Sequence, residues 1–133
     1  MTVVVGYMPN EFGEAALAAG VREARRRGTR LLVVNATLGD TYVDDRFVGT
    51  SAVPALRERL DSYDVPIEFR QEMGSGVSQL LVEAARDADA QVLVIGLRPR
   101  TPIGKMIMGS VAQRVLLDAP CAVLAVKPGA RGT

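Results

Sequence analysis

The chain has 133 residues and contains no histidine, no tryptophan and a single cysteine, and these shortages exclude several kinds of site. Without histidine the protein cannot have a Ser-His-Asp triad, a histidine metal ligand or a nucleotidyl-transfer motif of the HxGH type. Cys121 alone can form neither an internal disulfide nor a Cys/His zinc site. Because Cys121 lies in an apolar run, we predict that it packs in the core and is not a nucleophile.

Long apolar runs are also missing from the chain. No run approaches the roughly 20 residues that a membrane-spanning helix needs, so no membrane partner is expected. The first predicted strand begins at Thr2, which leaves no room for a signal peptide, and we therefore expect a cytoplasmic protein. The arginine triplet at 25–27 could contact nucleic acid, but it ends a predicted helix, where the helix dipole favours cations. No nucleic-acid partner is expected.

Short β-branched runs alternate with amphipathic helical patterns along the chain. Strands are predicted at 2–7, 30–36, 65–70, 92–95 and 121–126. Helices are predicted at 14–27, 52–63, 77–88 and 111–117. This βαβαβαβαβ order favours a parallel sheet with helices on both faces. The chain is long enough for the core of one domain, expected over residues 1–128, with a flexible tail at 129–133.

Individual residues predict where some of these elements begin and end. Ser51 is expected to cap the second helix, and Ser110, with Gln113 three residues later, fits a capping box for the fourth. Gly28 is a natural stop for the first helix. Pro66 lies within the third predicted strand and therefore places that strand at a sheet edge, since proline cannot donate to a ladder of hydrogen bonds.

The charges between the fourth and fifth predicted strands are of one sign. No carboxylate lies between Asp89 and Asp118. The same span holds the cations Arg98, Arg100, Lys105 and Arg114. The whole chain has a net charge of only +1, so this is a local concentration. It flanks the head of the fourth helix, and helix N-termini favour anions. A phosphate groove is the simplest function for this stretch, and a solvated basic loop is the alternative.

The stretch from Gln91 to Pro128 resembles the C-terminal part of the UspA-type universal stress protein family. Nucleotide-binding members of that family carry G-x2-G-x9-G-[ST] after the fourth strand. Gly96 and Gly109-Ser110 match this pattern, whereas Pro99 stands in place of the second glycine. The resemblance extends over nearly the whole chain. It implies a doubly wound five-stranded parallel sheet of order 3-2-1-4-5, as in adenine nucleotide alpha-hydrolase-like proteins.

The resemblance also implies a site for ATP or a related adenine nucleotide, carried with Mg²⁺, at the carboxyl ends of strands one and four. The residues at the positions of the family's site are Met8, Pro9, Ala36, Gly96, Gly109, Ser110 and the backbone of Val111. Arg98 and Arg100 could add charge-assisted contacts to phosphate. Met8 stands where the family usually has an aspartate that holds adenine, so that hydrogen bond is lost. Backbone groups at Ala36 would still serve as the second adenine contact.

Catalysis is not expected beyond slow ATP hydrolysis. Gly104-Lys105 lacks the glycine and Ser/Thr spacing of a Walker motif, and no carboxylate lies beside the phosphate loop to hold Mg²⁺. The acidic loop at 37–50 lacks the spacing of a calcium site, so no metal site of the protein's own is predicted. We expect a binding or signalling module of the stress response. An adenylating enzyme would need a glycine-serine loop after strand one, which residues 8–11 do not provide. A dimeric interaction module that does not bind nucleotide firmly is the alternative.

A homodimer through the fifth strand follows from the implied strand order. Strands three and five are then the sheet edges, and strand three carries Pro66 and the charges of Glu68 and Arg70. The fifth strand, Ala122 to Val126, is apolar on both faces and contains no proline. Such an edge pairs readily with another chain, and a second copy related by a two-fold axis is the commonest cover. Dimers of the family that this chain resembles pair through this strand.

Overall fold

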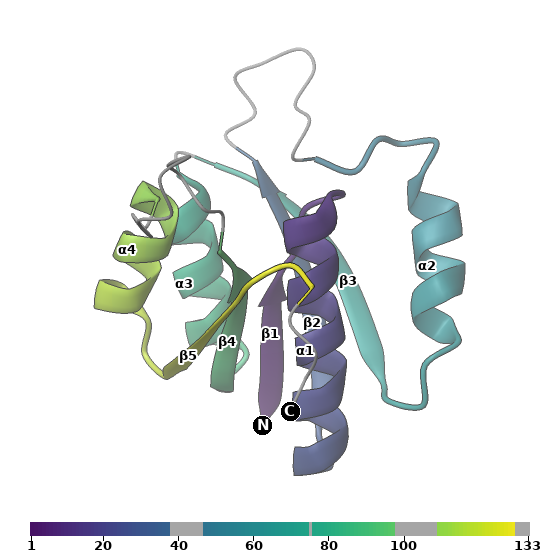
Figure 1. The fold of residues 1–133 in the computed structure, drawn as a ribbon, viewed down its shortest axis with the longest axis horizontal. Helices are drawn as coiled ribbons and strands as arrows, with labels where there is room; N and C mark the ends of the chain where they lie inside the picture. Colours follow the sequence, from purple (N-terminus) through teal and green to yellow (C-terminus); the bar gives the residue numbers. More distant parts are fainter. Residues whose placement is uncertain (38–46, 75, 98–108, 130–133) are drawn as a thin grey trace.

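The computed structural model describes residues 1–37, 47–74, 76–97 and 109–129 (Figure 1). The loop residues for which sequence predictions were made, Arg98, Pro99, Arg100, Gly104 and Lys105, lie outside this part of the chain. So does most of the acidic loop at 37–50.

One five-stranded sheet forms the centre of the molecule, with the order β3-β2-β1-β4-β5 and every neighbouring pair parallel. The strands are β1 (Thr2–Gly6), β2 (Arg30–Thr37), β3 (Ile67–Met73), β4 (Ala90–Gly96) and β5 (Ala122–Val126). The helices are α1 (Glu11–Arg27), α2 (Val53–Asp61), α3 (Val77–Asp87) and α4 (Ser110–Asp118). The predicted fold class and strand order are confirmed.

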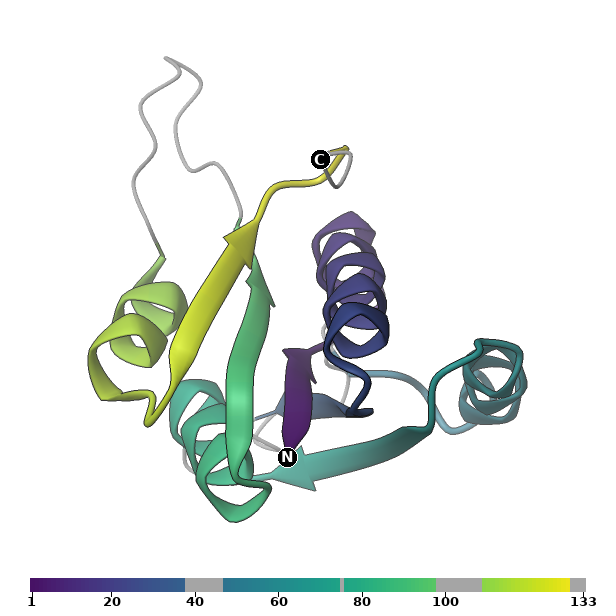
Figure 2. The same ribbon diagram turned by 90° about the horizontal axis from the view of Figure 1, so that it is seen from below.

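The helices cover both faces of the sheet, with α1 and α2 on one side and α3 and α4 on the other (Figure 2). Alternate residues of each strand point to opposite faces, so β1 contributes Val3 and Val5 to one core and Val4 to the other. Leu17 of α1 belongs to the first core and Leu81 of α3 to the second. The central strands are buried on both faces, which explains their continuous apolar runs.

The ends of several elements differ from the predictions. α1 begins at Glu11 because Asn10 caps it: the Asn10 side chain accepts hydrogen bonds from the backbone of Phe12 and Gly13. Ser51 is not a cap, since the residue before α2 is Ala52, which makes no side-chain cap bond. β3 begins after Pro66, and β5 begins after Cys121.

Two other local predictions, the helix stop at Gly28 and the edge position of β3, are confirmed. Gly28 ends α1 in the left-handed conformation, with φ of 64°, which glycine adopts at no steric cost. β3 is a sheet edge, as Pro66 predicted, although the proline precedes the strand. Cys121 is half-buried against the core formed with α3 and α4, and burial raises the pKa of its thiol. Among the helices that the structure describes, none is long and apolar enough to cross a membrane.

Candidate functional site

A cleft of about 160 Å³ opens at the carboxyl ends of β1, β2 and β4. Its lining comes from three strand ends and the first turns of α3 and α4, and consists of Gly6, Tyr7, Met8, Val34, Ala36, Val77, Leu81, Ile95, Gly96, Leu97, Gly109, Val111 and Ala112. The predicted residues Met8, Ala36, Gly96, Gly109 and Val111 are therefore brought together. The cleft lies where the chain order reverses between β1 and β4, which is where open parallel sheets bind ligands.

The walls of the cleft are apolar. Val34, Leu81 and Ile95 contribute side chains, and no charged side chain lines the part that the structure describes. Gly6 allows Leu81 to approach the end of β1 closely, since a Cβ added there would lie 2.9 Å from Leu81 Cδ1. An apolar cleft of this kind favours an apolar part of a ligand, with the polar recognition left to backbone groups.

Those backbone groups are supplied by the end of β2. Successive residues of a strand direct their N–H and C=O groups to opposite neighbours: Thr37 accepts from Gly74, beyond β3, whereas Val34 accepts from Tyr7, beyond β1. Ala36 has the same direction as Val34. Its N–H and C=O therefore point past the end of β1, where pairing with β2 stops at Gly6.

A second hollow, of about 470 Å³, adjoins the cleft and shares Val77 and Val111 with it. It is lined by Gly76, Val77, Ser78, Ser110, Val111, Gln113, Arg114 and Leu117. Ser110 lies here and not in the cleft. The predicted capping box is wrong, because Gly109 is the N-cap of α4 and makes no side-chain cap bond, so Ser110 is already helical. Among the described residues, no side-chain cap bond satisfies the first N–H groups of α4.

Gly96 has a packing role that the sequence did not reveal. A Cβ added there would lie 2.3 Å from the carbonyl oxygen of Phe12, so the end of β4 approaches the first turn of α1 closely because it carries glycine. Pro9 is exposed in the turn before α1 and does not line the cleft. Arg98 and Arg100 lie outside the described residues. Within the described residues no group of three or more potential metal ligands occurs.

The model of the Universal stress protein family matches residues 1–127. The chain belongs to this family. A universal stress protein of Mycolicibacterium smegmatis is 50% identical over 95% of this chain and 97% of its own length. A universal stress protein structure from Archaeoglobus fulgidus is similar with a TM-score of 0.76 and 29% identity, over 95% of this chain and 97% of that one. A structure of the universal stress protein from Archaeoglobus fulgidus in complex with dAMP is similar with a TM-score of 0.66 and 25% identity. The similarity covers 95% of this chain and 96% of that one.

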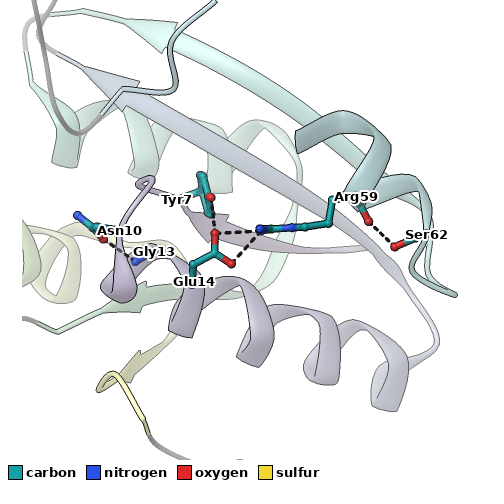
Figure 3. A network of polar contacts seen from close by, with 6 residues as sticks. All are labelled: Tyr7, Asn10, Gly13, Glu14, Arg59 and Ser62. Atoms are coloured by element: carbon teal, nitrogen blue, oxygen red, sulfur yellow. Dashed lines mark hydrogen bonds and ion pairs between the residues drawn. The ribbon is translucent and has the colours of Figure 1, made fainter. Parts of the chain in front are cut away.

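In this member of the universal stress protein family, Tyr7 carries a polar network beside the cleft (Figure 3). Its backbone lines the cleft, while its side chain points to the opposite face and donates to Glu14 Oε2 at 2.5 Å. Arg59 of α2 binds both oxygens of Glu14, at 2.8 and 2.9 Å. Burial, followed by the Glu14 carboxylate, raises the pKa of Tyr7 to about 12. No local sequence pattern predicts this network, because its members lie up to 52 residues apart in the chain.

Asn35 is the second residue that sequence reasoning missed in this family member. Its side chain is fully buried and donates from Nδ2 to the carbonyl oxygen of Tyr7 at 2.9 Å. Its Oδ1 accepts from the backbone of Val48 at 2.7 Å and from Gln71 Nε2 at 3.2 Å. The signal in the sequence is an asparagine that follows four apolar residues of β2, where a buried polar group needs partners.

Proposed function

We propose that this protein binds ATP or a related adenine nucleotide in the cleft and acts as a cytoplasmic binding module in stress response or signalling. The observation that carries the proposal is the combination of an apolar cleft with the N–H and C=O of Ala36, which point past the end of β1. An adenine ring has two apolar faces and, on one edge, an acceptor nitrogen beside an amino donor. The apolar cleft is complementary to the faces of the ring, and the N–H and C=O of Ala36 are complementary to its polar edge.

The base would be held without a carboxylate. Met8 lies two residues after the end of β1, lines the cleft and has an apolar side chain. Dispersion contacts with Met8, Val34 and Ile95 would therefore replace a charged hydrogen bond, and we expect moderate affinity. The Archaeoglobus fulgidus relative in complex with dAMP supports an adenine nucleotide as the ligand class.

The phosphates would lie at the amino end of α4. Gly109 caps this helix without a side chain, so the N–H groups at Ser110 and Val111 can meet an anion. Arg114 lines the adjoining hollow, and Arg98 and Arg100 are proposed as further cationic contacts. No carboxylate lines the cleft or the hollow among the described residues, so Mg²⁺ would be held chiefly by the phosphates.

A thermal-shift titration with ATP, ADP and AMP tests this function, with GTP as a control of the same charge as ATP. A ligand that binds only the folded state raises Tm with concentration, and at 100 times Kd the stabilisation is about 2.7 kcal/mol. We expect Tm to rise with the adenine nucleotides and to rise less with GTP. A Tm that none of the adenine nucleotides changes at millimolar concentration, with calorimetry in agreement, would refute nucleotide binding.

The second candidate function is a dimeric interaction module that does not bind nucleotide firmly. The observation that favours it is the edge strand β5, whose residues Val123 to Val126 are all partly exposed. Homodimerisation through β5 is compatible with an occupied or an empty cleft, because β5 contributes no residue to the lining. The two functions are therefore tested separately.

A further inference from the structure

We propose that Asn35 is a positioning residue of the cleft, which keeps the backbone edge of Ala36 open for a ligand by occupying the carbonyl group of Tyr7. The inference rests on the proposed nucleotide-binding function for the identity of the ligand. The arrangement of Asn35, Tyr7 and Ala36 stands on the hydrogen bonds of the structure itself.

The series of backbone hydrogen bonds between β1 and β2 ends one bond short of the end of β2. Gly6 pairs with Val34 in the final matched pair, and the N–H of Tyr7 then donates to the carbonyl of Val34 at 2.8 Å. In a parallel ladder the next bond would run from the N–H of Ala36 to the carbonyl of Tyr7. That bond is absent from the described part of the chain, and the Asn35 side chain donates to the Tyr7 carbonyl in its place.

The surroundings of Asn35 fix its orientation. Because the Val48 N–H and Gln71 Nε2 both donate to Oδ1, the amide nitrogen must be the end that faces Tyr7. Gln71 Nε2 also donates to the carbonyl of Val48 at 2.8 Å, and this bond links the segment before α2 to β3. An aspartate or a leucine at position 35 could not make the same donation at neutral pH, so the role requires an amide.

The consequence is selectivity for a ligand edge. One residue, Ala36, presents a donor and an acceptor side by side. Adenine offers the complementary pair, since N1 accepts and the 6-amino group donates. Hypoxanthine offers the reverse, because its N1 carries a hydrogen and its O6 accepts. Sites built on such pairs reject the mismatched analogue strongly, because polar groups are left unpaired. We therefore expect AMP to bind at least about ten-fold more tightly than IMP.

Paired variants test the role of Asn35 with calorimetric titrations of AMP and IMP. Asn35→Leu removes the donation to Tyr7, so the Ala36 N–H can close the ladder, and the AMP affinity should fall to about that of IMP. Gln71→Met is the matched control. It removes the hydrogen bond from Gln71 Nε2 to Asn35 Oδ1 and leaves the bond from Asn35 Nδ2 to the Tyr7 carbonyl intact. A merely structural role would lower both affinities equally. A folded Asn35→Leu variant that retains the full preference for AMP would overturn the proposal.

A measurement on the unliganded wild-type protein keeps the inference separate from the proposed function. Nuclear magnetic resonance can detect a coupling across the hydrogen bond from the Ala36 nitrogen to the Tyr7 carbonyl carbon. We expect no such coupling in the wild type and its appearance in Asn35→Leu. A coupling already present in the wild type refutes the inference whether or not nucleotide binds. If neither AMP nor IMP binds the wild type, the proposed function fails, while the coupling still decides whether Asn35 holds the Ala36 amide open.

Discussion

Tyr7 serves two parts of the molecule at once. Its backbone forms part of the cleft, and its side chain, 5% exposed, extends into the core between the sheet and α1. The hydroxyl is linked through Glu14 to Arg59 on α2, a helix that otherwise packs mainly through Leu56 and Leu60. The network therefore joins a peripheral helix to the residue that borders the site.

The protonation of Tyr7 predicts how stability depends on pH. Its pKa is about 12 in the folded protein and 10.0 as a reference, so the folded state retains the proton that the unfolded state loses. The stabilisation is complete below pH 10 and is lost as the pH rises from about 10 to 12, by at most roughly 1.4 kcal/mol per pH unit. Denaturant unfolding of the wild type should show this decline, and Tyr7→Phe should reduce it.

Tyr63→Phe is the matched control for that experiment. Tyr63 is half-buried against the same core, and its substitution removes one tyrosine without touching the Glu14 network. Equal slopes of stability against pH in the wild type and in Tyr7→Phe would contradict the assignment of the raised pKa to Tyr7.

Gly96 offers a second prediction for a single residue. Gly96→Ala places a methyl group against the Phe12 carbonyl, where only 2.3 Å is available, so the strand end or the helix must shift. We expect a loss of about 1–3 kcal/mol in the free energy of unfolding, the usual range for overpacking. Gly49→Ala is the control, since a Cβ at Gly49 meets nothing within 4 Å. A Gly96→Ala protein as stable as the wild type would contradict the packing role of Gly96.

The sequence predicted the lining of the cleft better than its supports. Met8, Ala36, Gly96, Gly109 and Val111 follow from a motif with fixed spacing and from the ends of predicted strands. Several of the polar contacts behind the lining join residues far apart in the chain, as Asn35 joins Tyr7 across 28 positions. No local pattern encodes such contacts, because they depend on the register between strands.

At the scale of elements, hydrophobic periodicity identified every strand and helix of the described chain, whereas capping residues were predicted less well. Ser51 and Ser110 both lie close to a helix start, yet neither caps, because a cap requires an extended backbone one residue before the helix. Asn10 fulfils that requirement with φ of −151°, and the sequence signal for it was the asparagine before two acidic residues in the first turn of α1. Sequence type alone does not fix a boundary to one residue.

The amino end of α4 provides the prediction that belongs to this scale. Gly109→Asp puts a carboxylate at the N-cap, where Asp is a favoured capping residue, so the unliganded protein should be as stable as the wild type or a few tenths of a kcal/mol more stable. The same carboxylate would repel a phosphate and occupy the N–H groups that are proposed to bind it. ATP affinity should therefore fall by about 100-fold or more, as measured by calorimetry.

Gly109→Asn separates the two causes, because asparagine caps the helix without a charge. We expect it to weaken ATP binding less than Gly109→Asp does. Adenosine has no phosphate, and its affinity should change little in either variant. An unchanged ATP affinity in a folded Gly109→Asp protein would exclude the phosphates from the head of α4.

At the scale of the whole molecule, the two edges of the sheet differ in how they are protected. β3 carries an ion pair between Glu68 and Arg70 at 2.6 Å, and α2 packs beside it with Arg57 over the ring of Phe69. Charged groups of this kind discourage pairing with another strand. β5 has no charged residue between Ala122 and Val126, and no strand of the described chain covers its outer edge.

A homodimer through β5 is the prediction that follows from this difference. Each copy would present its free edge to the other about a two-fold axis, and the partly exposed Leu124 and Val126 would become buried. Leu124→Lys combined with Val126→Lys adds like charges that meet across the axis. The dissociation constant of the dimer should therefore increase by at least about 100-fold. Glu68→Lys, on the opposite edge, is the control and should remain dimeric. Sedimentation velocity distinguishes these outcomes, and circular dichroism checks that each variant is folded. A wild-type chain that sediments as a monomer at roughly tens of micromolar, well above the Kd of a stable dimer, would rule out this interface.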